Sequence, residues 1–111
     1  MSPKPHKYRA KPTIVDGIRF ASKKEANRYC ELQLLQKSGN ISRLVLQQSF
    51  PLKVISPWNL EEIIIGKYKA DFAYIENNKL VVEDVKGYLT QIYRWKKKHF
   101  EAQYNIRIRE T

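Results

Sequence analysis

Cysteine, acidic residues and long apolar runs are all scarce in this chain. Cys30 is the single cysteine among 111 residues, so an internal disulfide is excluded and no Cys/His cluster suggests zinc. No apolar run approaches the roughly 20 residues of a membrane span, and the opening MSPKPHKYRAKP has no apolar signal-peptide core. We therefore expect a protein of the reducing cytoplasm that makes no membrane contact.

The charge of the chain is strongly unbalanced. Lys and Arg number 21 against 11 Asp and Glu, which gives a formal net charge of +10 at pH 7. Such a basic chain favours a polyanionic partner, nucleic acid above all, although a repulsive surface would also serve solubility alone. Hydrophobic residues make up 42% of the chain, as in ordinary globular domains, and its length suffices for one modest core. We expect one compact domain.

The first twelve residues are basic and rich in proline, with no apolar periodicity. They carry Lys4, Lys7, Arg9 and Lys11. This pattern predicts a flexible basic arm over 1–12 that lies along phosphates, and an ordinary disordered terminus is the alternative. The folded domain is then expected over 13–111.

The rest of the chain alternates strand and helix signals. Asp16-Gly17 between two β-prone triplets predicts a hairpin over 13–20. Ser22 and Gly39 suit the ends of a helix over 23–37, whose apolar face is predicted to contain Ala26, Tyr29, Cys30, Gln33 and Leu34. Alternation predicts a strand over 41–55, with Pro51 at a bulge or sheet edge. Residues 60–65 lead into the next strand, Thr90 caps a second helix over 91–104, and residues 106–109 form a closing strand.

A hairpin over residues 68–86 organises the predicted fold. Two β-prone runs flank Asn77-Asn78, and Asn tolerates the positive φ that tight hairpin turns require. With the turn centred there, facing residues have numbers that sum to 155. Asp71 then lies opposite Asp84, Lys69 lies opposite Lys86, and all four share one face of the sheet, while Glu83 points to the other face.

Two opposed carboxylates imply either a shared proton or a bound cation. Facing Cβ atoms are about 5 Å apart, and like charges at that distance are destabilising. A hard divalent ion with oxygen ligands is the usual cation for such a site, so Asp71 and Asp84 are predicted metal ligands. Glu25 at the start of the first helix is a further candidate ligand. The alternative for Glu25 is a capping box with Ser22.

With a Glu on the first helix, an Asp on one strand and Asp-x-Lys on the next, residues 13–109 resemble the PD-(D/E)XK nuclease superfamily, especially its small phage-borne members. The resemblance implies an αβββαβ core of the restriction endonuclease type, an α/β domain with a central mixed sheet flanked by helices. It also implies Asp71, Asp84, Lys86 and Glu25 as catalytic residues, the three acids as metal ligands. The superfamily's proline is replaced by Ala70.

The chemistry that fits is hydrolysis of a DNA phosphodiester with Mg²⁺, or with Mn²⁺, which accepts the same ligands. Lys86 is expected to position the attacking water or to stabilise charge on phosphorus, a structural ion pair being the alternative. Candidate DNA contacts are Lys7, Arg9, Lys11, Lys69, Tyr93, Arg94, Lys97 and Lys98. For the lysine run of the second helix, the alternative is an exposed solvated face.

One domain offers one active site, so a homodimer is required to cut both strands of DNA. The same holds for resolving a four-way (Holliday) junction in phage recombination, replication or packaging. The competing hypotheses are a non-catalytic DNA-binding module that retains the fold, and an accessory factor whose charge serves solubility.

Overall fold

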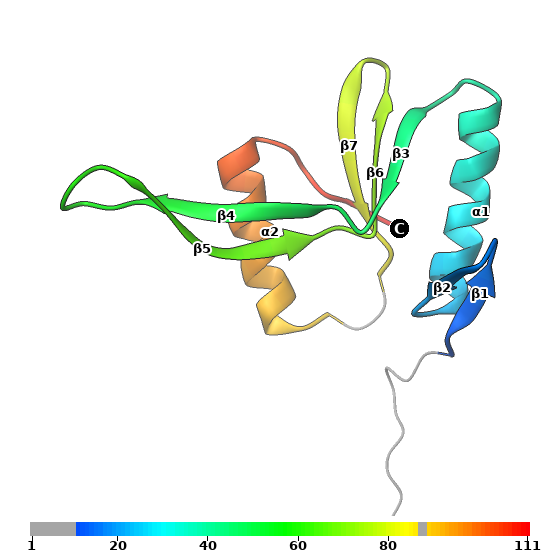
Figure 1. The fold of residues 1–111 in the computed structure, drawn as a ribbon, viewed down its shortest axis with the longest axis horizontal. Coiled ribbons are helices and arrows are strands. Elements are labelled where there is room, and N and C mark those ends of the chain that lie inside the picture. The colour runs from blue at the N-terminus through cyan, green and yellow to red at the C-terminus, as the bar shows by residue number, and fades with distance from the viewer. Residues whose placement is uncertain (1–10, 87–88) are drawn as a thin grey trace, which may run out of the picture.

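The computed structural model describes residues 11–86 and 89–111. Within these residues, two helices and eight strands follow one another in the order β1 (Thr13–Val15), β2 (Ile18–Phe20), α1 (Lys23–Lys37), β3 (Ser42–Leu46), β4 (Ser49–Ile55), β5 (Glu62–Lys69), β6 (Phe72–Glu76), β7 (Lys79–Asp84), α2 (Gln91–Tyr104) and β8 (Arg109–Glu110). Figure 1 shows α1 and the β1–β2 hairpin on one side of the molecule and α2 with the β4–β5 hairpin on the other. Both helices have the bounds predicted from the sequence.

The central sheet has four strands in the order β3-β6-β7-β8. β6 pairs antiparallel with β3 and β7, whereas β7 pairs parallel with β8, so the sheet is mixed. Phe72 and Tyr74 of β6 pack with Leu32 of α1. Val82 of β7 packs instead with Phe100 of α2. The chain is therefore a single α/β domain whose sheet lies between two helices, as expected.

The β6–β7 turn has the predicted geometry. Asn77 and Asn78 both have positive φ, at 53° and 63°. Glu76 pairs with Lys79, and Phe72 pairs with Glu83, which is the register in which facing numbers sum to 155. This confirms the register of the hairpin.

The prediction that Lys69 faces Lys86 is wrong. Lys69 is the last residue of β5, where it pairs with Ser49 of β4, and a new strand begins at Phe72. The predicted strand over 41–55 is broken in the same way, between β3 and β4. Both breaks belong to one long hairpin, in which β3 and β4 form one arm and β5 and β6 form the other. This hairpin bends at Gln47 and Asp71, where the Gln47 backbone amide donates to the Asp71 carbonyl at 3.1 Å. The alternation of apolar residues continues through the bend and therefore does not reveal it.

Two smaller predictions also need correction. Cys30 and Leu34 are exposed, because the buried stripe of α1 is rotated and consists of Glu25, Ala26, Tyr29 and Leu32. The closing strand is shorter and later than predicted, since the Ile108 amide donates to Oε2 of Glu101 rather than to a neighbouring strand. Only Arg109 and Glu110 pair with β7.

Glu83 lies on the opposite face from Asp84, where it ties the sheet to α1. Its carboxylate is fully buried and accepts hydrogen bonds from Arg28 at 2.6 and 3.1 Å, from Tyr74 at 2.5 Å and from Thr111 at 3.1 Å. Burial alone would raise the pKa of Glu83, but these donors lower it below its usual value. Glu83 is therefore an ionised structural group.

Replacing Arg28 by alanine should destabilise the fold strongly. The change leaves Glu83 buried without its cationic partner, a loss that costs about 3 kcal/mol. Urea unfolding at pH 7 measures this cost, and Arg94→Ala on the exposed face of α2 is the matched control. Equal stability of the two variants would contradict the structural role of the Arg28–Glu83 pair.

Candidate active site

Asp71 and Asp84 are held together by reciprocal hydrogen bonds at the bend of the long hairpin. The Asp71 amide donates to Oδ1 of Asp84 at 3.1 Å. The Val85 amide donates to Oδ2 of Asp71 at 2.9 Å. The Asp84 carboxylate thus accepts a hydrogen bond from the backbone of Asp71, and the Asp71 carboxylate accepts one from the residue after Asp84. These two hydrogen bonds fix the position of one aspartate relative to the other. The hydroxyl of Tyr68, near the end of β5, donates a hydrogen bond to Oδ2 of Asp84.

Glu25 approaches the pair from the first turn of α1. Ser22 caps this helix by accepting from the Glu25 amide at 3.1 Å, as predicted. The side-chain amide of Gln47 lies between two acids, with Nε2 at 3.3 Å from Oε2 of Glu25 and at 3.4 Å from Oδ1 of Asp71. Gln47 thus bridges Glu25 to the aspartates.

Lys86 lies two residues beyond the end of β7, where the charges of Asp84 and Asp71 act on it. Its Nζ lies 3.5 Å from the centroid of the Tyr93 ring and 3.8 Å from Oε2 of Glu110. Burial lowers the pKa of Lys86 below its usual value, although the charges of Asp84, Glu110 and Asp71 act in the opposite direction. The ammonium group is therefore oriented by an aromatic ring and a carboxylate next to the two aspartates.

The pKa values of all three acids are raised, chiefly by burial. Burial raises the pKa of Asp84 to about 6, the Tyr68 hydroxyl opposes this shift, and the charge of Asp71 adds to it. Burial likewise raises the pKa of Asp71, against the hydrogen bond from Val85 and together with the charge of Glu25. Burial also raises the pKa of Glu25, opposed by a hydrogen bond from the Ala21 backbone. The site concentrates negative charge that water solvates poorly.

The donor set fits a divalent cation held by two carboxylates. In the part of the chain that the structure describes, no group of three His, Cys, Asp or Glu side chains is arranged to hold an ion. Asp71 and Asp84 nevertheless combine two hard oxygen donors with raised pKa values. Mg²⁺ binds through one or two carboxylates and keeps several waters. Glu25 would join them only if the Gln47 amide moved from between it and Asp71.

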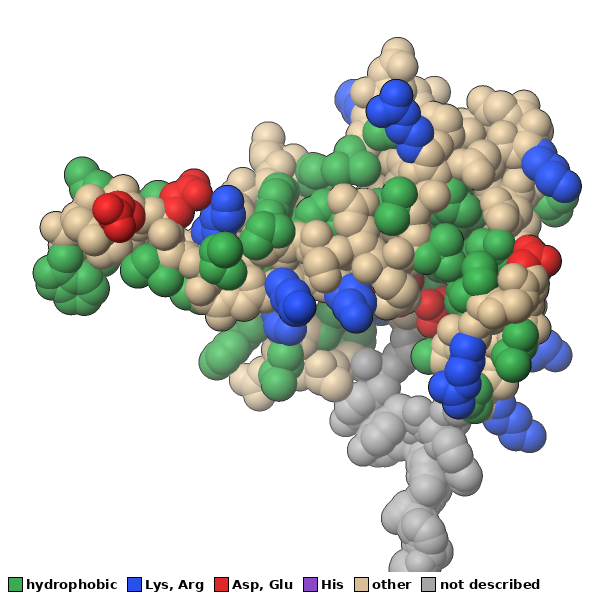
Figure 2. Space-filling view, viewed as in Figure 1, with side chains coloured by type: hydrophobic (Ala, Val, Ile, Leu, Met, Phe, Trp, Pro, Cys, Tyr) green, Lys and Arg blue, Asp and Glu red, His purple; other side chains and the backbone are tan. Residues whose placement is uncertain are grey.

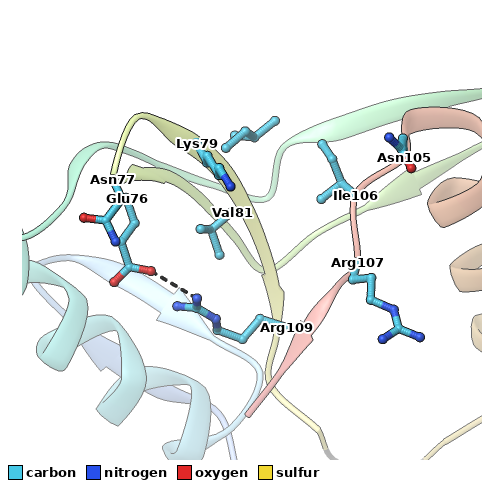
Figure 3. A pocket seen from close by; sticks show the side chains of 9 residues that line it. Glu76, Asn77, Lys79, Val81, Asn105, Ile106, Arg107 and Arg109 are labelled. Atoms are coloured by element: carbon cyan, nitrogen blue, oxygen red, sulfur yellow. Dashed lines mark ion pairs between the residues drawn. The ribbon is translucent and has the colours of Figure 1, made fainter.

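A hollow of about 420 Å³ opens beside the carboxylates. Its lining contains Glu25, Gln47 and Asp71 together with Leu46 and residues 18–21, whereas Asp84 and Lys86 are not part of it. A separate cavity of about 560 Å³ lies at the β6–β7 turn, where Arg109 pairs with Glu76 at 3.0 Å (Figure 3). Its lining contains none of the predicted catalytic residues, so the hollow beside Asp71 is the candidate substrate site.

The predicted DNA contacts divide into three groups. Lys7 and Arg9 lie outside the described residues, whereas Lys11 and Lys69 are exposed. On α2, Arg94 and Lys98 are exposed, but Tyr93 and Lys97 are already engaged. The Tyr93 hydroxyl donates to Oε2 of Glu110 at 2.8 Å, and Lys97 Nζ lies 3.4 Å from the same oxygen.

Sequence reasoning missed Gln47, Tyr68 and Glu110. The only sequence signal at Gln47 was the polar pair Gln47-Gln48, because the apolar residues before and after it keep the same alternation. Glu110 reaches the site because β8 runs parallel to β7 and places it beside Asp84. Tyr68 had no local signal, since its role depends on the bend between β5 and β6.

The model of the family described as "Protein of unknown function (DUF1064)" matches residues 5–110. The chain therefore belongs to this family. Comparisons with curated proteins and with solved structures gave no match. Among the described residues, neither helix is long and apolar enough to cross a membrane.

Replacing Asp84 by asparagine should stabilise the protein at pH 7.5 in buffer with a chelator. The pKa of Asp84 is about 6 when folded, above its ordinary value near 3.8. The stability that its protonated form contributes is therefore complete below pH 4 and is lost as the pH rises through 6. Since one pKa unit corresponds to about 1.4 kcal/mol, Asp84→Asn should gain on the order of 1–2 kcal/mol at pH 7.5.

The gain should shrink towards zero near pH 4, where wild-type Asp84 is already protonated. Urea unfolding at pH 4.5, 6 and 7.5 measures the trend. A variant that is less stable than the wild type at all three pH values would contradict the raised pKa of this carboxyl group.

Proposed function

We propose that this protein is a metal-dependent DNA endonuclease of the PD-(D/E)XK type. One observation carries the proposal: buried Asp84 and half-buried Asp71, both with raised pKa values, are hydrogen-bonded side by side, and the charge of the partly buried Lys86 acts on both. A purely structural ion pair would lower the pKa of its acids, as the Arg28–Glu83 pair lowers that of Glu83. Two carboxylates that remain poorly compensated suit a site that takes up a cation.

In this mechanism Asp71 and Asp84 would hold Mg²⁺ or Mn²⁺. When bound, the ion would polarise the phosphate and make hydroxide accessible near neutral pH. Lys86, held in place by Tyr93 and Glu110, positions the attacking water or stabilises the charge that develops on phosphorus. Glu25 accepts a hydrogen bond from Gln47 and is the candidate third ligand.

The substrate we propose is DNA, bound mainly through its backbone in the cytoplasm of a bacterial host. The net charge of +10 supplies the attraction, and phosphate contacts give affinity without sequence readout. Branched DNA, such as a four-way junction in phage recombination, replication or packaging, is the substrate class suggested by the resemblance. Cutting both strands requires two copies.

A non-catalytic DNA-binding module is the second candidate. The position of Gln47 favours it, because its amide separates Glu25 from Asp71 and leaves only two acids together. Such a module would bind the same DNA without cleaving it.

Alanine at Asp84 or at Lys86 should abolish Mg²⁺-dependent cleavage and leave DNA binding largely intact. Asp84 is a proposed ligand and Lys86 acts on the reacting groups, so each loss removes chemistry rather than affinity. Labelled duplex, single-stranded, flap and four-way substrates are incubated with and without Mg²⁺. Lys37→Ala, an exposed lysine at the end of α1, is the control and should cut normally. Undiminished cleavage by both site variants would eliminate the assignment.

The double variant Arg94→Ala with Lys98→Ala should weaken DNA binding and its dependence on salt. Both side chains are exposed on the same flank of α2, where they can meet phosphates. Removing two phosphate contacts lowers the slope of log K against log salt by about 2. Binding titrations over a range of salt concentrations, with Lys37→Ala as control, measure this slope, and an unchanged slope would exclude this flank from the interface.

A further inference from the structure

The end of the β4–β5 hairpin exposes an unusual amount of apolar surface. Trp58 is 89% exposed and Ile64 is 64% exposed. We call the exposed hydrophobic residues here the apolar tip; they are Val54, Ile55, Trp58, Leu60, Ile63, Ile64 and Ile65. Figure 1 shows this hairpin extending away from the sheet, and Figure 2 shows hydrophobic side chains gathered along it. Apolar patches of this size mark interaction sites in water-exposed proteins.

The tip also differs from the rest of the chain in charge. Residues 54–66 contain no Lys or Arg and two acids, Glu61 and Glu62, for a formal charge of −2. The total of +10 therefore leaves +12 on the remaining residues. Lys53, next to the tip, pairs with Glu62 at 3.2 Å, so residues 53–66 carry one Lys and two Glu for a formal charge of −1. A surface of net negative charge is poorly suited to nucleic acid or to anionic lipid. It is well suited to a basic protein surface with apolar residues of its own.

The chain itself carries such a surface, on α2. Trp95 is 70% exposed and Ile92 is 65% exposed. They line a groove of about 330 Å³ together with Ile65, Lys96 and His99. Lys96 gives this groove the positive charge that the tip lacks. The groove matches the tip both in apolar character and in the sign of its charge.

The areas involved suit a dimer. Stable interfaces bury about 800 Å² on each partner, and their cores are rich in tryptophan. Two largely exposed tryptophans, with seven exposed aliphatic residues in the tip and on α2, provide apolar surface of that order. An extended two-stranded hairpin is also only marginally stable in water by itself. Contact with a partner would stabilise it.

We propose that the apolar tip binds a second copy of this chain. The tip of each copy lies against the α2 groove of the other, with Glu61 facing Lys96 of that helix. The contact is reciprocal, as two-fold symmetry requires. It does not depend on chemistry at Asp84, but it would supply the two active sites that cutting both strands needs.

Light scattering or sedimentation of the full chain tests the dimer at concentrations of tens of micromolar. The wild type should have twice the monomer mass of 13.2 kDa, and Ile64→Lys should return it to the monomer. Leu34→Lys is the matched control, because Leu34 is 68% exposed on α1 and should leave the dimer intact. Urea midpoints establish that both variants are folded.

A wild-type chain that stays monomeric would overturn the proposal. A monomer that sediments with phosphatidylglycerol vesicles would likewise overturn it, because the tip would then bind lipid and not a second copy. A dimer that survives Ile64→Lys in a folded variant would overturn it as well. Loss of dimerisation with retained nicking of DNA would leave the proposed nuclease standing, so the two proposals fail separately.

Charge exchange tests the placement of the tip. Glu61→Lys and Lys96→Glu should each weaken dimerisation several-fold when alone. An equimolar mixture should restore it, because each tip in the mixed dimer then meets a helix of opposite charge. A contact within one chain cannot give this result. A mixture that remains as weak as its components would place the tip elsewhere than on the partner's α2.

Discussion

The reciprocal hydrogen bonds between Asp71 and Asp84 are the constraint on which the candidate site depends. Each carboxylate accepts the amide that lies beside the other, so neither aspartate can turn away without losing a buried hydrogen bond. The same bonds hold two acids together in a poorly solvated place. Burial raises the pKa values of both, and the charge of Asp71 raises that of Asp84 further while the charge of Glu25 raises that of Asp71. A cation at this position would relieve the repulsion without moving the backbone.

The bent hairpin supplies this geometry and also separates two tasks. Inside the bend, β3 and β6 join the central sheet and carry Asp71 next to β7. Beyond it, β4 and β5 leave that sheet, pack on α2 and continue into the apolar tip. Tyr68 and Gln47, which flank the bend, contact Asp84 and Asp71. The neighbouring Glu83 faces away and connects the sheet to α1. Adjacent residues of β7 thus belong to the candidate site on one face of the sheet and stabilise the fold on the other.

The predictable parts of this structure rest on local rules. The Asn77-Asn78 turn fixes the register, and the register alone brings Asp71 opposite Asp84. The caps Ser22 and Thr90 mark the starts of both helices. The unpredicted parts depend on contacts between distant segments. Nothing local distinguishes a continuous strand over 68–75 from two strands in different sheets, so Lys69 was misplaced. Gln47 was overlooked because its position opposite Asp71 depends on the same bend. The parallel β7–β8 pair, which brings Glu110 to Lys86, is likewise set by packing.

A crystal grown with Mn²⁺ tests the central claim most directly, because anomalous scattering locates that ion without reference to activity. We expect one peak between Asp71 and Asp84, with an oxygen of each carboxylate at about 2.1 Å, a ligand distance typical of a small hard divalent cation. The peak should disappear in Asp71→Asn crystals of the same form. Ordered Asp71 and Asp84 side chains with no ion between them, at saturating Mn²⁺ and neutral pH, would contradict the metal site and with it the proposed nuclease.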